Sequence, residues 1–185
     1  MNSAYWPAVG AHTTHTLLFS LEIDSAGAIA ALDRLPYGIG VGLNLDDLEG
    51  GTKDVSEESL MNFHLMSEAL KAHGNKLMIC FGGNGRSNGF PGLARKSRMK
   101  KFMKQLTRLV QFLQLDGVDY NWEYPGFNFG SGYQDEKAID KDYKTLLTLV
   151  KATREKFRKR VVVVLYLSLR FNSLRYIYIY IYIYK

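Results

Sequence analysis

The fold is decided by residues 115–126, which read LDGVDYNWEYPG. Acid or amide side chains alternate with large apolar ones in this run, and the alternation predicts a β-strand because successive strand side chains point to opposite faces. Asp119, Asn121 and Glu123 therefore share one face, while the apolar or aromatic residues at positions 118, 120, 122 and 124 share the other and should pack under a helix. Burying three polar groups in such a strand costs free energy unless they are hydrogen-bonded. Their presence therefore suggests that they have a function. We prefer this interpretation to a solvated edge strand, which rarely carries four aromatic or branched residues on its second face.

The same stretch resembles the active-site strand of the family 18 glycoside hydrolases, which include chitinases and chitinase-like proteins. The family pattern is Asp-x-x-Asp-x-Asp-x-Glu, and it falls here on Asp116, Asp119, Asn121 and Glu123. From Asp116 to Pro125 the chain departs from the longer family pattern only at position 121, where asparagine replaces aspartate. The resemblance implies a (β/α)8 TIM barrel that acts on chitin or chito-oligosaccharides.

A second stretch, residues 76–83 (KLMICFGG), is a continuous apolar run that ends in paired glycines. Such a run predicts a strand buried on both faces of a parallel sheet. It resembles the Ser-x-Gly-Gly motif of family 18, with Cys80 in place of serine and Gly82 and Gly83 as the glycines. Glycines at a strand end let the backbone pass close to a ligand or to a neighbouring strand. We predict that Cys80 is a packed core thiol rather than a nucleophile.

Strand and helix patterns alternate along the rest of the chain. Further strands are predicted over residues 14–23 and 160–167, the first being barrel strand two, and residues 5–7 resemble the end of strand one. A helix begins with a capping box over residues 54–57 and stops at residues 73–75. Its predicted apolar face, on which His64 would be a packed histidine, consists of Leu60, Met61, His64, Leu65 and Leu70.

Two more helices are predicted from their apolar stripes, which give a parallel sheet with right-handed crossovers. The stripe of the helix before the acidic strand consists of Met99, Phe102, Met103, Leu106, Leu109, Val110 and Leu113. The stripe of the helix after it consists of Tyr143, Leu146, Leu147, Val150 and Phe157.

The length of 185 residues is short for a complete barrel, which needs roughly 250 residues with about 200 near the lower limit. We therefore expect an α/β fold of the family 18 barrel type, truncated to about strands 1–5. Residues 1–165 would be a partial catalytic domain and residues 166–185 an aberrant low-complexity tail. The alternating Tyr-Ile run could form a strand, although one with a high risk of aggregation. A TA dinucleotide repeat read in frame also encodes Tyr-Ile, so our hypothesis is that the coding sequence leaves the barrel after Val164.

The composition excludes several classes of function. The formal net charge is +6, but the basic clusters at 95–101 and 154–160 lack interleaved aromatic residues, so a solvated helix face is expected rather than a nucleic-acid site. One cysteine excludes an internal disulfide. We predict no membrane span, no metal and no cofactor, and residues 1–10 show no signal-peptide pattern. Localisation stays unknown from the sequence, since secretion is implied by the resemblance alone.

The chemistry implied by the resemblance centres on Glu123. Residues two apart on a strand are roughly 6.6 Å apart and residues four apart roughly 13 Å, so Asp119 and Glu123 are too distant for a direct two-carboxylate mechanism, which wants about 5 to 9.5 Å. Family 18 enzymes use the N-acetyl oxygen of the substrate as the nucleophile, so Glu123 would be the general acid and then the general base. Asn121 would orient the acetamido group without offering a charge.

The remaining predicted residues support these two. The predicted catalytic set is Glu123, Asn121 and Asp119, and the predicted substrate-binding or supporting set is Asp116, Gly82, Gly83 and Tyr124. Asp119 and Asp116 would fix Asn121 and the strand end, and Tyr124 could turn towards the mouth of the barrel. The alternative is a non-catalytic chitinase-like sugar-binding protein or an inactive fragment. Retention of Glu123 favours the enzyme, whereas Asn121 and the later barrel strands that this sequence lacks favour the alternative.

Overall fold

The computed structural model describes residues 5–47, 54–128, 130–157, 162–171 and 175–183. Its main sheet has six strands in the order β2-β1-β3-β4-β7-β8. Four of them run parallel and follow one another in chain order: β1 His15–Ile23, β3 Lys76–Gly82, β4 Gly117–Asn121 and β7 Val162–Phe171. Two antiparallel strands border them: β2 Ile29–Ala30 beside β1 and β8 Arg175–Ile183 beside β7.

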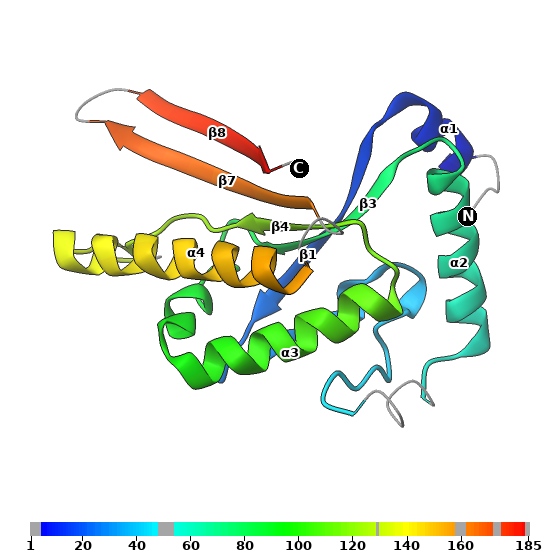
Figure 1. Cartoon of the computed structure of the whole chain (residues 1–185), viewed down its shortest axis with the longest axis horizontal. Helices are drawn as coiled ribbons and strands as arrows, with labels where there is room; N and C mark the ends of the chain where they lie inside the picture. Colours follow the sequence, from blue (N-terminus) through cyan, green and yellow to red (C-terminus); the bar gives the residue numbers. More distant parts are fainter. Residues whose placement is uncertain (1–4, 48–53, 129, 158–161, 172–174, 184–185) are drawn as a thin grey trace.

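Each parallel strand is joined to the next through a helix. The connecting helices are α2 Glu57–Lys71, α3 Lys96–Phe112 and α4 Glu136–Phe157, and α1 Tyr5–His12 precedes the sheet. Figure 1 shows α3 and α4 on the same side of the sheet, with β7 and β8 running together at its far edge. Short 3-10 turns lie at Leu32–Arg34, Pro36–Gly38 and Phe90–Ala94, and β5 Phe127–Asn128 pairs with β6 Gly132–Tyr133. The structure confirms the predicted alternation of parallel strands and helices.

The core lies between the sheet and these helices. Phe81 on β3 meets Phe102 of α3 edge-on, with ring centroids 5.2 Å apart. Tyr120 on β4 is fully buried, and its hydroxyl shares a 2.7 Å hydrogen bond with the hydroxyl of Thr153 on α4. Trp122 stacks on Phe90 with centroids 4.9 Å apart. Because full burial of such a side chain contributes about 1.5–3 kcal/mol, this apolar face of the acidic strand anchors the helices, as predicted.

Two predicted boundaries were wrong. Residues 5–7 lie in the first turn of α1 rather than at the end of a strand. The N-cap of α2 is Ser56, whose hydroxyl oxygen accepts from the backbone N–H of Ser59 at 3.1 Å, so the helix begins two residues later than the predicted capping box. Ser56 has the extended backbone and the accepting side-chain oxygen that an N-cap requires. The predicted stop after α2 is confirmed, because Gly74 has a φ of +76° and Asn75 N–H donates back to Leu70 O.

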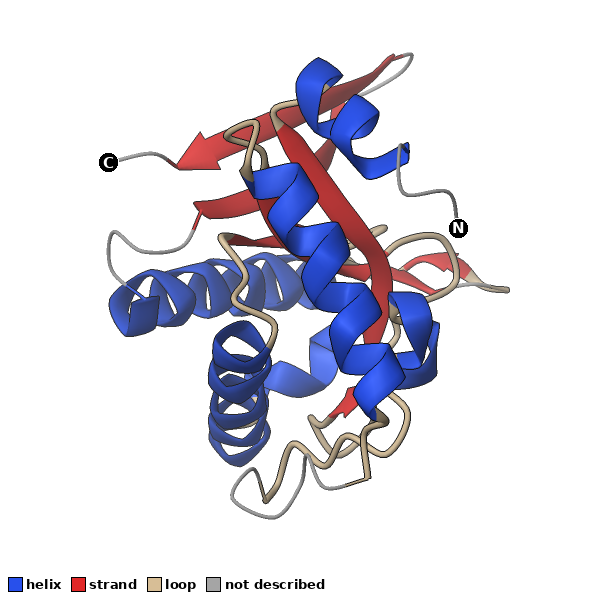
Figure 2. Cartoon of the chain, turned by 90° about the vertical axis from the view of Figure 1, so that its right-hand side faces the viewer, coloured by secondary structure: helices blue, strands red, loops and turns tan. Residues whose placement is uncertain are grey.

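The predicted apolar faces of α2 and α4 were partly wrong. In α2 the predicted Leu60, Met61, His64 and Leu65 are exposed, so His64 is not a core residue. The buried stripe of that helix is Phe63, Met66, Ser67 and Leu70. In α4 the predicted Leu147 is 54% exposed, and the buried stripe includes three polar residues, Asp142, Thr145 and Thr153. Figure 2 shows the molecule from the side on which α2 lies, with helices in front of the strands of the sheet.

The strand predicted over residues 160–167 is confirmed from Val162 onward, since residues 160 and 161 lie outside the described part. The Tyr-Ile run forms most of β8, in antiparallel register with β7 from Val163↔Ile183 to Phe171↔Arg175. The Tyr-Ile run therefore forms a strand, and the hypothesis that the coding sequence leaves the barrel after Val164 stays a prediction. Within the described part of the chain, no helix has the length and apolar character needed to cross a bilayer.

Candidate active site

The candidate site lies where β1, β3 and β4 end. Parallel strands place their carboxyl ends at one edge, which is where barrel enzymes carry their functional residues. The register pairs Gly82 at the end of β3 with Asn121 at the end of β4. The same edge therefore receives the Gly82-Gly83 pair, Asn121 and the residues that follow it, as the two sequence motifs predicted.

The two glycines are required by close backbone contacts. Gly82 and Gly83 have φ values of +96° and +97°, a region that side chains disfavour. A Cβ on Gly82 would lie 2.4 Å from the carbonyl oxygen of Asn121, so this glycine lets β3 approach its neighbouring strand. A Cβ on Gly83 would lie 2.9 Å from the ring of Phe19 and 3.5 Å from Nδ2 of Asn121. Gly83 therefore keeps open the space between Phe19, which is 59% exposed, and the Asn121 amide.

Asn121 carries an unsatisfied acceptor. Its side-chain oxygen Oδ1 is buried, and no donor among the described residues reaches it. Buried polar atoms nearly always have a hydrogen-bond partner, and an unpaired one costs about 1–3 kcal/mol. Its backbone is well held, since Asn121 O accepts from Gly83 N at 2.7 Å. The side chain thus provides an acceptor that lacks a donor among the described residues, at the end of a strand whose backbone is held in place.

Asp119 and Cys80 form a buried pair opposite each other on β4 and β3. Burial raises the pKa of Asp119 to about 6, and the hydrogen bond that the Cys80 thiol donates to it limits the rise. Burial, reinforced by the nearby Asp119 carboxylate, raises the pKa of the Cys80 thiol far above its ordinary value. Cys80 is therefore a packed, protonated thiol, as predicted. Asp119 is 6% exposed, and with this raised pKa it loses its proton around pH 6.

Glu123 follows the end of β4 and is partly exposed. Its backbone N–H donates to the hydroxyl oxygen of Ser87 at 3.0 Å. Three residues on, the N–H of Gly126 donates to Oδ2 of Asp142 at 2.8 Å, and burial raises the pKa of Asp142. Tyr124 is partly buried and meets the ring of Phe127 edge-on at 6.3 Å. The segment that carries Glu123 is therefore tied to the rest of the fold on both sides.

Asp116 lies at the opposite end of the strand. Its carboxylate accepts from Leu77 N at 3.1 Å and pairs with Lys76 at 3.6 Å, at the start of β3. It fixes the beginning of the β3–β4 ladder rather than Asn121. The spacing explains this placement, because residues five apart on a strand are roughly 17 Å apart.

Comparison with known proteins places these features in a family. The sequence pattern of Glycosyl hydrolases family 18 matches residues 12–182. The chain belongs to this family. No curated protein sequence matches this family 18 chain.

Solved structures share the fold of the family 18 chain. The Group IV chitinase of Ostrinia furnacalis superposes with a TM-score of 0.56 at 21% identity, over 82% of this chain and 35% of that one. The chitinase RmChi1 of Rhizomucor miehei gives 0.57 at 20%, over 82% and 39%. The chitinase-like agglutinin of Robinia pseudoacacia gives 0.56 at 17%, over 89% and 42%. The chain thus spans about two fifths or less of the length of these structures. The superpositions show a mixed α/β fold with a curled parallel sheet like that of the family 18 barrel.

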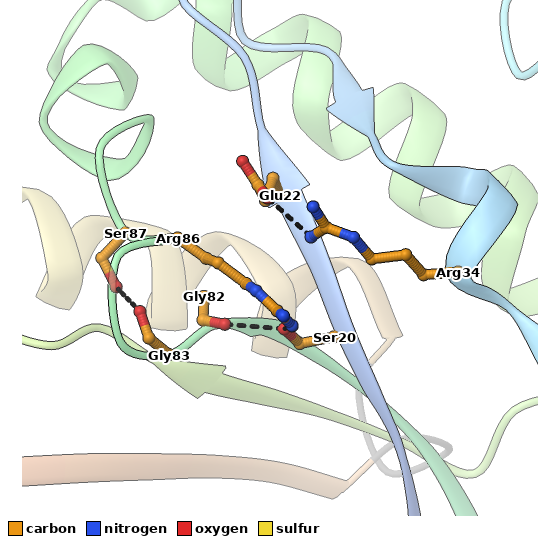
Figure 3. Close-up of polar contacts among 7 residues, drawn as sticks. All are labelled: Ser20, Glu22, Arg34, Gly82, Gly83, Arg86 and Ser87. Atoms are coloured by element: carbon orange, nitrogen blue, oxygen red, sulfur yellow. Dashed lines mark hydrogen bonds and ion pairs between the residues drawn. The ribbon is translucent and has the colours of Figure 1, made fainter.

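Several polar residues near the site of this family 18 chain were not anticipated from the sequence. Ser20 on β1 donates to Gly82 O at 2.8 Å, and Arg86 donates to the Ser20 hydroxyl at 3.0 Å while lying over the Phe19 ring at 5.8 Å. Figure 3 shows Arg86 reaching from the loop after β3 across Gly82 to Ser20, beside the Glu22–Arg34 ion pair. No pattern in one sequence marks these residues. Their roles arise from where the loop returns over the strand ends.

No group of three or more histidine, cysteine, aspartate or glutamate side chains in the described residues is arranged to hold a metal ion. The acidic and amide side chains at the end of β4 are those of Glu123, Asn121 and the buried Asp119.

Proposed function

We propose that the chain acts on β-1,4-linked N-acetylglucosamine polymers, with Glu123 as general acid and then general base. The observation that carries the proposal is the buried, unpartnered Oδ1 of Asn121, two residues before Glu123. The N–H of an acetamido group could donate the hydrogen bond that Asn121 Oδ1 lacks. Family membership supports the glycosidase class, and the acetamide donor narrows it to N-acetylated sugars.

The proposed reaction needs no nucleophile from the protein. Glu123 donates its proton to the glycosidic oxygen while the acetamido oxygen attacks the anomeric carbon of the same sugar. The bond from that carbon to the glycosidic oxygen breaks, the leaving sugar departs as an alcohol, and a cyclic oxazolinium ion remains. Asn121 holds the acetamido N–H so that the oxygen points at the anomeric carbon. Glu123 then removes a proton from the water that opens the ring, so its own proton is restored and the configuration is retained.

Known ligands of similar structures support the substrate class. The Ostrinia furnacalis chitinase was solved in complex with allosamidin, and a mutant of a class V chitinase from Nicotiana tobaccum was solved with NAG4. Their chains share only 21% and 14% identity with this one. The substrate assignment therefore depends mainly on the Asn121 and Glu123 geometry.

The test is hydrolysis of chito-oligosaccharide by the full chain and by Glu123→Gln. This substitution keeps the size and the hydrogen bonds of the side chain but removes its acid, so we expect the rate to fall to background. Asp116→Asn is the matched control, because Asp116 lies at the other end of the strand. An unchanged rate in Glu123→Gln would remove the catalytic assignment.

A non-catalytic sugar-binding protein is the second candidate. The neutral side chain of Asn121 favours it, because an aspartate there would offer a charge to the oxazolinium ion. The fold of a chitinase-like agglutinin is among the similar ones. In that case Asn121→Ala would weaken binding of chito-oligosaccharide, while neither the wild type nor Glu123→Gln would hydrolyse it.

A further inference from the structure

The backbone hydrogen-bond ladder between β3 and β4 becomes irregular at the N–H of Glu123. Gly83 N donates to Asn121 O at 2.7 Å, as a regular parallel ladder requires. In such a ladder the next bond runs from the N–H two residues further on, that of Glu123, to the carbonyl oxygen of Gly83. The chain instead turns at Gly83, whose φ is +97°, and the N–H of Arg86 donates to the Gly83 carbonyl at 3.0 Å.

The hydroxyl of Ser87 occupies the interrupted position. Its oxygen accepts from Glu123 N at 3.0 Å, and its proton has two acceptors in reach, Gly83 O at 3.2 Å and Asn121 O at 3.3 Å. Ser87 is 5% exposed, so water cannot replace this contact freely. Figure 3 shows Ser87 at the end of the loop, with its hydroxyl turned back to Gly83. One hydroxyl thus bridges the two strands as an inserted water molecule would.

We propose that Ser87 is a positioning residue for Glu123: it fixes the backbone of the general acid at a set distance from Asn121 and from the end of β3. The inference rests on the proposed role of Glu123. Ser87 holds the near end of the segment, and Asp142 holds its far end through Gly126 N. Between these anchors the Glu123 side chain can rotate, but its backbone cannot slide along the strand end.

The geometry explains why this contact matters for chemistry. A general acid must lie within hydrogen-bond reach of the glycosidic oxygen, and a misplacement of about 1 Å can lower a rate about 10²-fold. Without the Ser87 hydroxyl, the partly buried Glu123 N–H must move towards Gly83 O or lose its hydrogen bond to the protein. Either change moves Glu123 relative to Asn121.

Hydrogen exchange of individual amides tests the contact without relying on activity. In the full chain, read by mass spectrometry with electron-transfer fragmentation, the Glu123 amide should exchange at least about 10-fold more slowly than in an unstructured peptide, although β4 ends at Asn121. Ser87→Ala should remove this protection and leave the Tyr120 amide unchanged. Ser87→Thr, which keeps the hydroxyl, should restore it, and Ser97→Ala on exposed α3 surface is the matched control.

Kinetics test the consequence. Ser87→Ala should lower kcat on chito-oligosaccharide about 10- to 100-fold with KM little changed, and Ser87→Thr should recover most of the loss. A purely structural role would instead raise the exchange of Tyr120 and Glu123 together. If Ser87→Ala fails to fold, the wild-type chain still decides, because free exchange of its Glu123 amide would overturn the proposal.

The two proposals fail in different ways. If Glu123→Gln hydrolyses the substrate as fast as the wild type, the proposed function is wrong whatever the exchange data show. If Glu123→Gln is inactive but Ser87→Ala keeps both the slow Glu123 amide and the full kcat, the role of Ser87 is wrong and the proposed function stands.

Discussion

Substituting Asp119 by asparagine should remove a pH dependence from the folding stability. Burial raises the pKa of Asp119 from 3.8 to about 6, a rise of about 2.2 pH units. At about 1.36 kcal/mol per unit, the buried site disfavours the ionised carboxylate by about 3 kcal/mol relative to the unfolded chain. The side chain is 6% exposed, so water does not screen this penalty appreciably.

The sign follows from proton counting. Between about pH 4 and pH 6 the unfolded chain has lost the Asp119 proton while the folded chain still holds it, so stability falls as pH rises through this window. Below about pH 4 both states are protonated, and above about pH 6 both are ionised. Asp119→Asn cannot ionise, so its stability relative to the wild type should rise by about 3 kcal/mol across the window and stay level outside it.

Urea unfolding at a series of pH values measures this difference, since the other titrating groups are common to both proteins. Asp116→Asn is the control, because that carboxylate is partly exposed and contacts Lys76 at the far end of the strand. Cys80→Ala removes the thiol whose hydrogen bond lowers the pKa of Asp119. The pH range over which stability falls should therefore extend to higher pH in this variant. A difference between wild type and Asp119→Asn that stays flat from pH 4 to pH 7 would refute the reasoning.

Three other predictions concern the site and its support. Asn121→Asp supplies the missing charge and should raise kcat on chito-oligosaccharide by about 10²–10³, or about 2–4 kcal/mol; an unchanged kcat would contradict the charge argument. Gly82→Ala places a Cβ 2.4 Å from a carbonyl oxygen at φ +96° and should cost more than about 1–3 kcal/mol in urea unfolding, whereas Gly85→Ala, with open space at φ +74°, isolates the smaller backbone cost. Trp122→Ala should cost about 3–5 kcal/mol, and the exposed Leu147→Ala less than about 0.5; similar costs for the two would refute the packing described.

The strands could be predicted because their patterns were simple. After Lys76, every residue of β3 up to Gly82 is apolar or glycine and is buried, so no choice of face had to be made. In the acidic strand the alternation placed Tyr120 and Trp122 against the helices, where they lie. Parallel order followed from the helices between the strands. The antiparallel pairing of β8 with β7 was not predicted, because a repeat of two β-forming residues specifies neither a partner strand nor a register.

The faces of α2 and α4 could not be predicted from hydrophobicity, because buried polar residues form part of their stripes. Thr145 and Thr153 satisfy their hydroxyls within their own helix by donating to the carbonyl oxygens of Lys141 and Leu149 at 2.9 and 2.8 Å. A threonine bonded in this way can face a core at little cost. The sequence shows the apolar Leu147 and the polar Thr145 but not the local bond that reverses their places.

Some features of the site could be predicted from sequence motifs, whereas others depend on how the chain folds. Gly82, Gly83 and Asn121 meet because the register of two motif strands brings them together. Asp116, by contrast, is part of the same motif but serves the start of the ladder. Ser87 carries no signal, since its role depends on a turn that returns the loop to the strand ends.

Asn121 determines how charge is distributed at these strand ends. An aspartate at this position would lie roughly 6.6 Å along the strand from Asp119, and its negative charge would raise the pKa of the buried Asp119 further. With asparagine there, burial remains the main cause of the raised Asp119 pKa, and the nearest hydrogen-bond donor is Cys80. The burial of Asp119 between β3 and β4 is therefore what favours its protonated form. In the proposed reaction, Asn121 would therefore offer a neutral acceptor that can orient an acetamide, but it would not supply the charge with which an aspartate stabilises a cationic intermediate.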